Sequence, residues 1–343
     1  MSRRLRVGVV GLGRVSKSHL PAFRELRDII ELTALVSRDR EKLLEEAVKW
    51  EALKQYVAFE DALADPDIDA FLLLLPHHLH ASYTIKALRA GKHVLVEKPM
   101  ALNEEEAASM VEAAEQGGVT LMVGQSRRFF EPVIESIRLL RQKQIGDLIS
   151  INGLLLAHMD KPAVSWWQDK AKIGGFMIPL WGSHLLDYVV WAFGEMPVSV
   201  YAQGYSNNPN WEGEDEVSIS LKFARGRMAN LLLSFNAGAR PTDEDGLTGK
   251  RIWSTSDSIY ERYLIGSNGM MRLQDEYQLY LNSESVTRID KDGRNFVTQL
   301  REFAEAIMAG RQPLASGRDV LGVTKIMDAC FVSMKENRVV HLS

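Results

Sequence analysis

Residues 6–16, RVGVVGLGRVS, form the stretch of sequence that decides the fold. Leu5–Val10 is a short apolar run typical of a buried strand, and a helical pattern follows the turn. Between them, Gly11 permits a tight turn and Gly13 lets a ligand approach the backbone closely. Ser16 stands where a third small residue packs the helix on the strand. A strand, a glycine turn and a helix in this order predict a dinucleotide-binding turn, in which the helix N-terminus faces a pyrophosphate.

The end of the second predicted strand carries information about the cofactor. An acidic side chain there would hold the ribose hydroxyls of NAD, but this chain has Ser37 and Arg38. A guanidinium pairs with phosphate oxygens and stacks on adenine, so these residues favour NADP over NAD. Alternatively, Arg38 is a solvated loop charge and Asp39 faces the ribose. We expect Arg14 and Val15 to complete the cofactor turn.

The first third of the chain alternates short apolar runs with helical patterns, which is typical of βαβ units and a parallel sheet. We predict strands over Leu5–Val10, Glu31–Ser37, Ala70–Leu75, His93–Glu97 and Thr120–Gly124. We predict crossover helices over Lys17–Arg27, Arg40–Trp50, Ala81–Ala90 and Glu104–Gln116. Asn103 is the expected N-cap of the last helix, and Gly117-Gly118 is its expected end.

The pattern changes after about residue 124, which predicts a domain boundary there. The later strand candidates alternate apolar and polar residues, namely Ile149–His158, Val198–Gly204, Glu216–Phe223, Met228–Phe235, Tyr260–Ile265 and Val339–Leu342. Helices are expected over Pro132–Gln144, Phe296–Ala309 and Val320–Glu336. We therefore predict an α/β Rossmann domain with a mostly parallel, doubly wound sheet over 1–124. An α+β domain with a large, mainly antiparallel sheet and a few helices follows over 125–343.

Composition narrows the class of ligand. The chain has 343 residues and a formal net charge of −4 without long runs of one sign, so neither nucleic acid nor a membrane is an expected partner. The apolar stretch behind Met1–Arg6 is short and contains two glycines, so we expect no signal peptide. Cys330 is the only cysteine, which fits the cytoplasm and excludes an internal disulfide. Small molecules are the expected ligands.

Two polar segments follow the predicted strands that end at Leu75 and Glu97, and the carboxyl edge of such a sheet binds ligands. The first contains Pro76, His77, His78 and His80. The second, Glu97-Lys98-Pro99, puts an ammonium group beside the expected nicotinamide, where partial burial would lower its pKa. The clustered histidines lack a nearby carboxylate at zinc-ligand spacing, so we expect no metal site.

The chain resembles the Gfo/Idh/MocA oxidoreductases over nearly its whole length. The segments that carry the resemblance are Gly11-Leu12-Gly13, 76–80, Gly91–Pro99, Arg127-Arg128-Phe129 and Gly182–Asp187. The resemblance implies a Rossmann domain, then an open antiparallel sheet through which copies associate as dimers or tetramers. It also implies hydride exchange between NAD(P) and a carbinol, often on a sugar or cyclitol, with the substrate between the two domains.

In this resemblance Lys98 matches the catalytic lysine and His184 matches the histidine that exchanges a proton with the substrate hydroxyl. Many family members carry an aspartate four residues before that histidine, where this chain has Leu180. Losing that carboxylate weakens His184 as a base. Three outcomes stay open: Lys98 and His184 act alone; Tyr188, His158 or His78 substitutes; or the site binds cofactor without turnover.

The remaining site predictions fall into two groups. Residues expected near the cofactor, besides those of the glycine turn and Ser37-Arg38, are Leu75, Pro76, His78, His80, Glu97 and Lys98. Residues expected near the substrate are Arg128, His158, Trp167 and Tyr188, since arginines meet anionic groups and tryptophans stack on sugar rings. A place in the core or at an interface is the alternative for Trp167, and a salt bridge at the domain junction is the alternative for Arg128.

Three functions compete on this basis. The leading hypothesis is an NADP-preferring oxidoreductase of a sugar- or cyclitol-like secondary hydroxyl or ketone. The second is cofactor-assisted glycoside cleavage through transient oxidation, which leaves no net cofactor turnover. The third, motivated by Leu180, is a nucleotide-binding regulatory protein.

Overall fold

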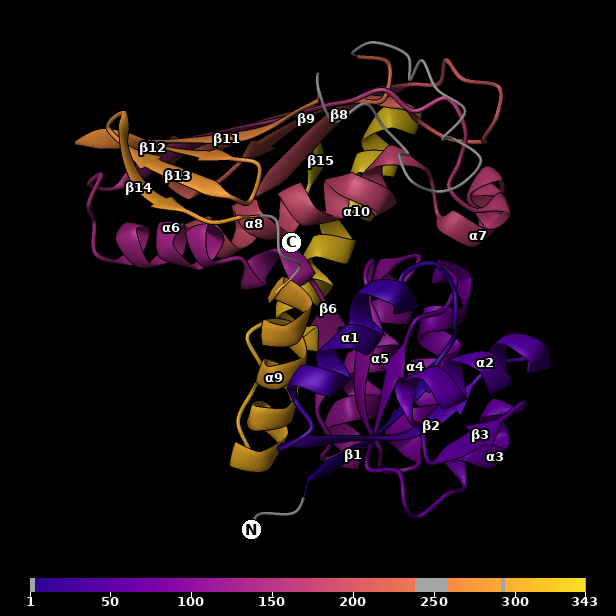
Figure 1. Cartoon of the computed structure of the whole chain (residues 1–343). Coiled ribbons are helices and arrows are strands. Elements are labelled where there is room, and N and C mark those ends of the chain that lie inside the picture. The colour runs from indigo at the N-terminus through magenta and orange to yellow at the C-terminus, as the bar shows by residue number, and fades with distance from the viewer. Residues whose placement is uncertain (1–3, 238–257, 291–293, 343) are drawn as a thin grey trace. The chain divides into compact units, whose positions relative to one another are not determined.

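The structure is a computed structural model that describes residues 4–237, 258–290 and 294–342. The chain forms two compact units (Figure 1). The first comprises Met1–Phe129 and Asp292–Leu321, and the second comprises Phe130–Lys291 and Gly322–Ser343. The single boundary predicted near residue 124 did not include this return of a late segment to the first unit.

The first unit is built on a six-stranded parallel sheet in the order β3-β2-β1-β4-β5-β6. Its strands are β1 (Leu5–Val10), β2 (Ile30–Val36), β3 (Lys54–Tyr56), β4 (Ala70–Leu73), β5 (His93–Glu97) and β6 (Leu121–Gly124). Five of these strands are as predicted to within one or two residues; β3 was not predicted. The order reverses between β1 and β4, which creates the switch point where such sheets bind ligands.

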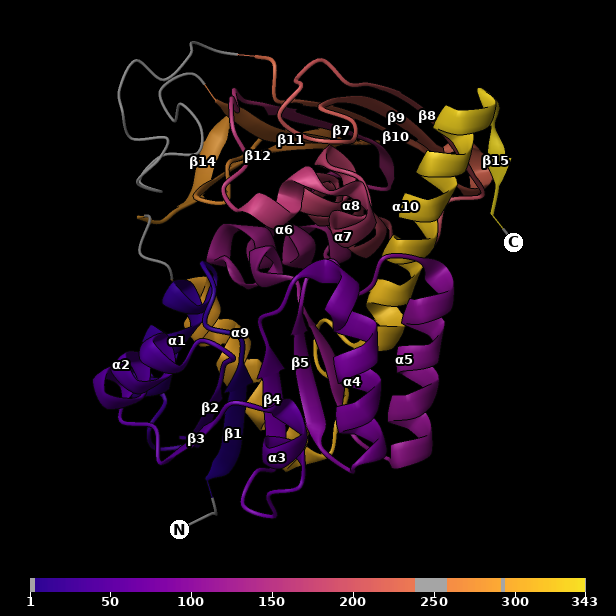
Figure 2. The same cartoon turned by 90° about the vertical axis from the view of Figure 1, so that its right-hand side faces the viewer.

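Helices cover both faces of this sheet (Figure 2). They are α1 (Ser16–Glu25), α2 (Arg40–Trp50), α3 (Phe59–Leu63), α4 (His80–Arg89), α5 (Glu104–Gly117) and α9 (Arg294–Ala309). Helices α1, α2 and α9 share one core with β1, β2 and β4, in which Phe23, Leu43 and Phe303 are buried. Helices α4 and α5 pack on each other beside β5. As predicted, the Asn103 side chain caps α5 and Gly118 ends it in the left-handed conformation.

The second unit is built on a nine-stranded sheet in the order β14-β13-β12-β11-β7-β10-β9-β8-β15. Its strands are β7 (Leu148–Leu156), β8 (Ser199–Tyr205), β9 (Glu216–Lys222), β10 (Met228–Ser234), β11 (Ile259–Gly266), β12 (Gly269–Gln274), β13 (Gln278–Leu281), β14 (Glu284–Arg288) and β15 (Val340–His341). Only β7 and β10 pair in parallel, so the sheet is mainly antiparallel, as predicted.

Helices lie on one face of this sheet. The helices of the unit are α6 (Glu131–Arg141), α7 (Lys170–Ile173), α8 (Ser183–Phe193) and α10 (Gly317–Glu336), and α10 begins in the first unit. Helix α6 packs on β12 and β13, and α8 packs on β7. Strand β9 has buried Val217, Ile219 and Leu221 alternating with exposed Ser218 and Ser220. Within the described residues, the face opposite α6 and α8 is therefore an open surface of alternating exposed side chains.

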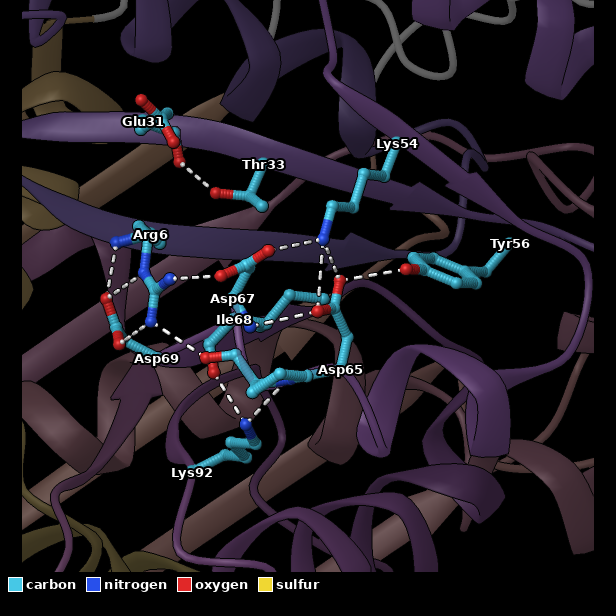
Figure 3. A network of polar contacts seen from close by, with 11 residues as sticks. Arg6, Glu31, Thr33, Lys54, Tyr56, Asp65, Asp67, Ile68, Asp69 and Lys92 are labelled. Carbon is cyan, nitrogen blue, oxygen red and sulfur yellow. Dashed lines mark hydrogen bonds and ion pairs between the residues drawn. The ribbon is translucent and has the colours of Figure 1, made fainter.

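A polar network joins the amino ends of the first unit's parallel strands (Figure 3). Arg6 at the start of β1 forms a two-pronged contact with Asp69, at 3.0 and 2.9 Å. Lys54 at the start of β3 donates to Asp65 at 2.8 Å, and Lys92 before β5 donates to the carbonyls of Asp65 and Ile68. The network therefore fixes the edge of the sheet opposite the switch point.

Asp65 is the most strongly held carboxylate of this network. Burial by itself raises its pKa, but hydrogen bonds from Lys54, the Asp67 N–H and Tyr56 outweigh burial and hold the pKa at about 2. Because this value lies below the ordinary 3.8, the stabilisation is present above pH 4 and is lost as the pH falls toward 2.

Replacing Asp65 with asparagine is expected to lower the free energy of unfolding by about 1–2 kcal/mol at pH 7, because charge-assisted hydrogen bonds are lost. Urea unfolding measures this, and the difference from wild type should shrink between pH 4 and pH 2. The exposed Asp61→Asn serves as the control and should change stability little. A constant difference across that pH range would contradict the assignment.

Candidate functional site

The glycine turn after β1 lies at the switch point. Gly11 has a φ of +96°, and a Cβ there would lie 2.5 Å from the Leu74 carbonyl oxygen after β4, so only glycine fits. A Cβ on Gly13 would meet open space instead. Ser16 is buried, and its Oγ donates to the Gly13 carbonyl at 2.7 Å. Helix α1 has Val15 as its N-cap residue, without a side-chain cap or an acidic residue in its first turn. These features fit a diphosphate over the turn.

The residues at the end of β2, where a cofactor ribose is expected, make local contacts with the backbone. Asp39 is the N-cap of α2, and its Oδ1 accepts the Lys42 N–H at 3.1 Å. The Ser37 Oγ accepts the Asp39 N–H at 3.3 Å, and Arg38 is exposed. The carboxylate of Asp39 is thus used in capping a helix.

The segment after β4 contains three histidines, of which His80 and His78 lie in different surroundings. His80 is fully buried, with one ring nitrogen 2.8 Å from the Leu75 carbonyl oxygen and the other 2.8 Å from that of Pro99. This ring ties the loop after β4 to the Lys98-Pro99 segment, so we interpret His80 as a brace behind the site. His78 is half-buried, and its Nδ1 has no hydrogen-bond partner within the described parts of the chain. His78 is therefore the better candidate of the two for ligand contact.

Lys98 follows β5 at the same edge of the sheet and is half-buried. Desolvation lowers its pKa to about 8, the attraction of Glu97 opposes this shift, and Arg127 and Arg14 reinforce it. The ammonium thus lies within the field of two arginines that come from the segments after β1 and β6. A cluster of three cationic groups at a switch point fits an anionic ligand and an oxyanion formed on a substrate.

The carboxylate of Glu97 is held from two sides. Its Oε1 accepts a hydrogen bond from His19 Nε2 at 2.7 Å, and its Oε2 accepts the Lys98 N–H at 3.1 Å. A Cβ on Gly124 would lie 2.9 Å from Oε1, so β6 needs glycine at this point. His19 was not among the predicted site residues; it lies on α1, 78 positions from Glu97. A lone histidine in an amphipathic helix carries no local signal of such a partner.

The two arginines after β6 differ in their contacts. Arg128 is buried, and its Nη1 donates to the Leu314 carbonyl at 2.6 Å within the first unit. Arg127 is half-buried and acts electrostatically on Lys98. We therefore favour Arg127 over the predicted Arg128 for contact with a ligand.

In the second unit, His184 lies in the first turn of α8 and is 7% exposed. A π-helical turn, Ile178–Gly182, leads directly into this helix, and such turns are frequent at functional sites. The Trp181 ring meets the His184 ring edge-on at a centroid distance of 5.9 Å. Leu180 is buried and offers no hydrogen-bond acceptor in its side chain. His184 therefore has an aromatic neighbour and an apolar residue one turn earlier.

The hydroxyl of Tyr188 is buried inside the second unit and bonds another side chain there. Its hydroxyl pairs with Ser136 Oγ on α6 at 2.9 Å, and burial raises its pKa to about 12. The Arg262 guanidinium lies over its ring at 5.2 Å. Tyr188 thus joins α8 to α6, and we assign it a packing role.

The other predicted substrate residues lie in the segment after β7. His158 Nε2 is 2.9 Å from Asp160 Oδ1, and the residue forms an isolated bridge with Asn236. Trp166 and Trp167 are half-buried and meet edge-on at 6.1 Å, and Trp167 also packs against Phe176. These tryptophans extend an aromatic cluster of the second unit, so their predicted stacking on a sugar ring stays a prediction.

Metal-ligand clusters and membrane-spanning helices are considered for the described residues alone. No three histidine, cysteine, aspartate or glutamate side chains among them gather as metal ligands. None of the helices in the described ranges is long and apolar enough to span a bilayer.

Comparison with known proteins decides the family. Residues 5–125 match the "Oxidoreductase family, NAD-binding Rossmann fold" model, and residues 134–252 match the "GFO/IDH/MocA C-terminal domain" model. The chain belongs to the GFO/IDH/MocA oxidoreductase family. This confirms the resemblance inferred from the motifs and the predicted fold class.

Individual relatives of this GFO/IDH/MocA protein have different substrates in their names. It is 26% identical to 4-carboxy-2-hydroxymuconate-6-semialdehyde dehydrogenase of Sphingobium sp., over 97% of this chain and 99% of the relative. It is 23% identical to the NADP(+)-dependent scyllo-inositol 2-dehydrogenase of Bacillus subtilis, over 98% and 96% of the two chains. The crystal structure of aldose-aldose oxidoreductase from Caulobacter crescentus, complexed with glycerol, matches with a TM-score of 0.85 and 26% identity, covering 99% and 100%.

Proposed function

We propose that this oxidoreductase is NADP-preferring and exchanges hydride with a secondary hydroxyl or ketone of a sugar- or cyclitol-like substrate. The observation that carries the proposal is Lys98, half-buried with a pKa of about 8, in the field of Arg14 and Arg127 beside the glycine turn. The inositol and aldose substrates named for two relatives support the substrate class.

The proposed chemistry divides between two side chains. A nicotinamide cofactor held at the glycine turn would supply the hydride acceptor for oxidation of a carbinol and the hydride donor for reduction of a ketone. The His184 imidazole takes the hydroxyl proton during oxidation and gives it back during reduction. The Lys98 ammonium stabilises the negative charge that develops on the substrate oxygen. The turn at Gly11 and Gly13, with the first amides of α1, holds the diphosphate.

Lys98→Ala and His184→Ala are each expected to lower kcat about 100-fold or more while cofactor affinity is kept, because each removes a group that acts in the transition state. Initial rates of NADPH formation or consumption with a panel of sugars, cyclitols and their keto forms measure this. Tyr188→Phe is the matched control in α8 and should keep kcat, since its hydroxyl bonds Ser136. Unchanged rates in both alanine variants would refute the assignment.

The same assay has a pH signature. Since Lys98 acts in its charged form, kcat/KM should fall as the pH rises through about 8. Glu97→Gln removes the attraction that raises the pKa of Lys98, so this limb should move to lower pH. Release of an aglycone without net NADPH change would instead favour glycoside cleavage. Tight cofactor binding without turnover on any substrate would favour a regulatory protein.

The preference for NADP rests on the end of β2. Asp39 is engaged as the N-cap of α2, so the Ser37 hydroxyl and the exposed Arg38 guanidinium are left to meet a 2′-phosphate. The NADP(+) in the name of the inositol dehydrogenase relative is consistent with this preference.

Arg38→Ala is expected to weaken NADP binding about tenfold or more and to change NAD binding little, because a charge-assisted contact to the extra phosphate is lost. Fluorescence titration with NADPH and NADH measures the two affinities. Arg89→Ala, an exposed arginine at the end of α4, is the control and should change neither. An equal loss for both cofactors would contradict the 2′-phosphate contact.

We also propose that copies of the chain associate as dimers or tetramers through the open face of the nine-stranded sheet. On this face Leu232 of β10 is 37% exposed and lies beside Leu154 of β7, and Ile259 of β11 is 42% exposed beside Leu156. Adjacent exposed leucine and isoleucine side chains on a sheet are typical of a contact surface.

Leu232→Lys is therefore expected to convert the oligomer into monomers, because a charge would be buried in the contact. Light scattering after size-exclusion chromatography measures the molar mass. Val48→Lys, on an exposed position of α2 in the first unit, is the control and should keep the wild-type mass. A wild-type monomer, or a Leu232→Lys oligomer, would exclude this surface.

A further inference from the structure

Glu214 lies just before β9 and is 6% exposed. Its Oε1 accepts the Phe176 N–H at 3.1 Å and the Ile178 N–H at 2.9 Å. Its own carbonyl accepts the Met177 N–H at 3.0 Å. One residue therefore receives three consecutive backbone donors from the start of the segment that leads to His184.

The backbone around these contacts requires glycine. Gly213 has a φ of +129°, and a Cβ there would lie 2.9 Å from the Gly175 carbonyl carbon. Gly175 has a φ of +132°, and a Cβ there would lie 2.5 Å from the Phe331 ring and 3.1 Å from Glu214 Oε1. Both strained positions would clash with any side chain, so the two segments are fitted to each other.

A short segment with several hydrogen bonds joins the residues that Glu214 holds to His184. The π-helical turn Ile178–Gly182 begins at the residue whose N–H Glu214 accepts. Pro179 follows and has no N–H to donate. The Leu180 N–H then bonds the Phe176 carbonyl at 3.2 Å, and Ser183 Oγ bonds the Pro179 carbonyl at 3.0 Å. His184 is the next residue, so its backbone position follows from the anchor.

A buried carboxylate at this place also suits the electrostatics. The first N–H groups of a helix have no partners inside the helix and carry partial positive charge. The π turn and α8 have no side-chain cap of their own. Glu214 therefore provides from a neighbouring segment the acceptor that the helix itself lacks.

We propose that Glu214 is a positioning residue for His184. The Glu214 carboxylate fixes where the π turn begins and thereby where the His184 imidazole lies. The proposal rests on the proposed function in that it takes His184 as the acid/base group. Small displacements of a catalytic group cost rate more than they cost binding.

Three variants test the proposal. Glu214→Ala removes the acceptor and is expected to lower kcat about tenfold or more with little change in cofactor affinity. Glu214→Gln keeps an amide oxygen for the same N–H groups and should recover most of kcat. Glu212→Ala is the matched control, because the Glu212 carboxylate also accepts a backbone N–H, that of Lys170 at 3.2 Å, but at the surface. It should leave kcat unchanged.

A second measurement does not depend on turnover. Hydrogen exchange of the amides at 176–184, and the NMR signal of the His184 ring assigned with His184→Gln, report the anchor directly. We expect faster exchange and a displaced ring signal in Glu214→Ala and not in Glu212→Ala. If Glu214→Ala does not fold, Glu214→Asp takes its place, because it keeps the charge and withdraws it by one methylene.

The two readouts separate the two hypotheses. If the wild type turns over no substrate, the proposed function fails, and the exchange and ring signals still decide on Glu214. Protected amides and an unmoved His184 signal in the folded Glu214→Ala or Glu214→Asp variant would overturn the positioning role. Wild-type kcat in that variant would overturn it as well.

Discussion

The close approach of two chain segments at Gly11 is the constraint on which the first unit depends. The turn after β1 passes the Leu74 carbonyl so closely that a Cβ on Gly11 would lie 2.5 Å from its oxygen. This approach is possible because β1 and β4 are neighbours. The chain continues from β1 to β2 on one side and from β4 to β5 on the other, which makes the switch point. The glycine turn, His78, Lys98 and Arg127 then all follow strand ends at one edge. Parallel strand direction therefore gathers the candidate groups of the first unit at one edge of the sheet.

Stability and chemistry use opposite edges of the same sheet. At the amino ends, Arg6, Lys54 and Lys92 are satisfied by carboxylates and carbonyls of the 65–69 segment. At the carboxyl ends, burial disfavours the charged form of Lys98; the attraction of Glu97 opposes this effect, and Arg127 and Arg14 reinforce it. A cation kept in such a place is stabilised when a negative charge arrives, which is what an oxyanion or an anionic cofactor provides.

The sequence predicted the parts of this arrangement that have a local signal. The strands of the first sheet, the Asn103 cap and the glycine turn each follow from periodicity or from a residue type that one conformation requires. Strand β3 has three residues and α3 has five, too few to show a period. The His19–Glu97 contact and the return of the 292–321 segment join residues far apart in sequence. Arg127 and Arg128 lie in the same 3₁₀ turn, and no local pattern in the sequence shows that Arg128 is the more deeply buried of the two.

In the second unit, Leu180 affects how the His184 ring can be held. An aspartate at this position would hold the His184 ring by a side-chain contact and would favour its protonated form. Leucine can do neither, and the Trp181 ring packs edge-on against the His184 ring. The position of α8 depends on the π turn that precedes it, and the Glu214 carboxylate accepts the N–H groups of Phe176 and Ile178, where the chain enters that turn. The loss of one carboxylate beside the histidine thus increases the importance of another that acts through the main chain.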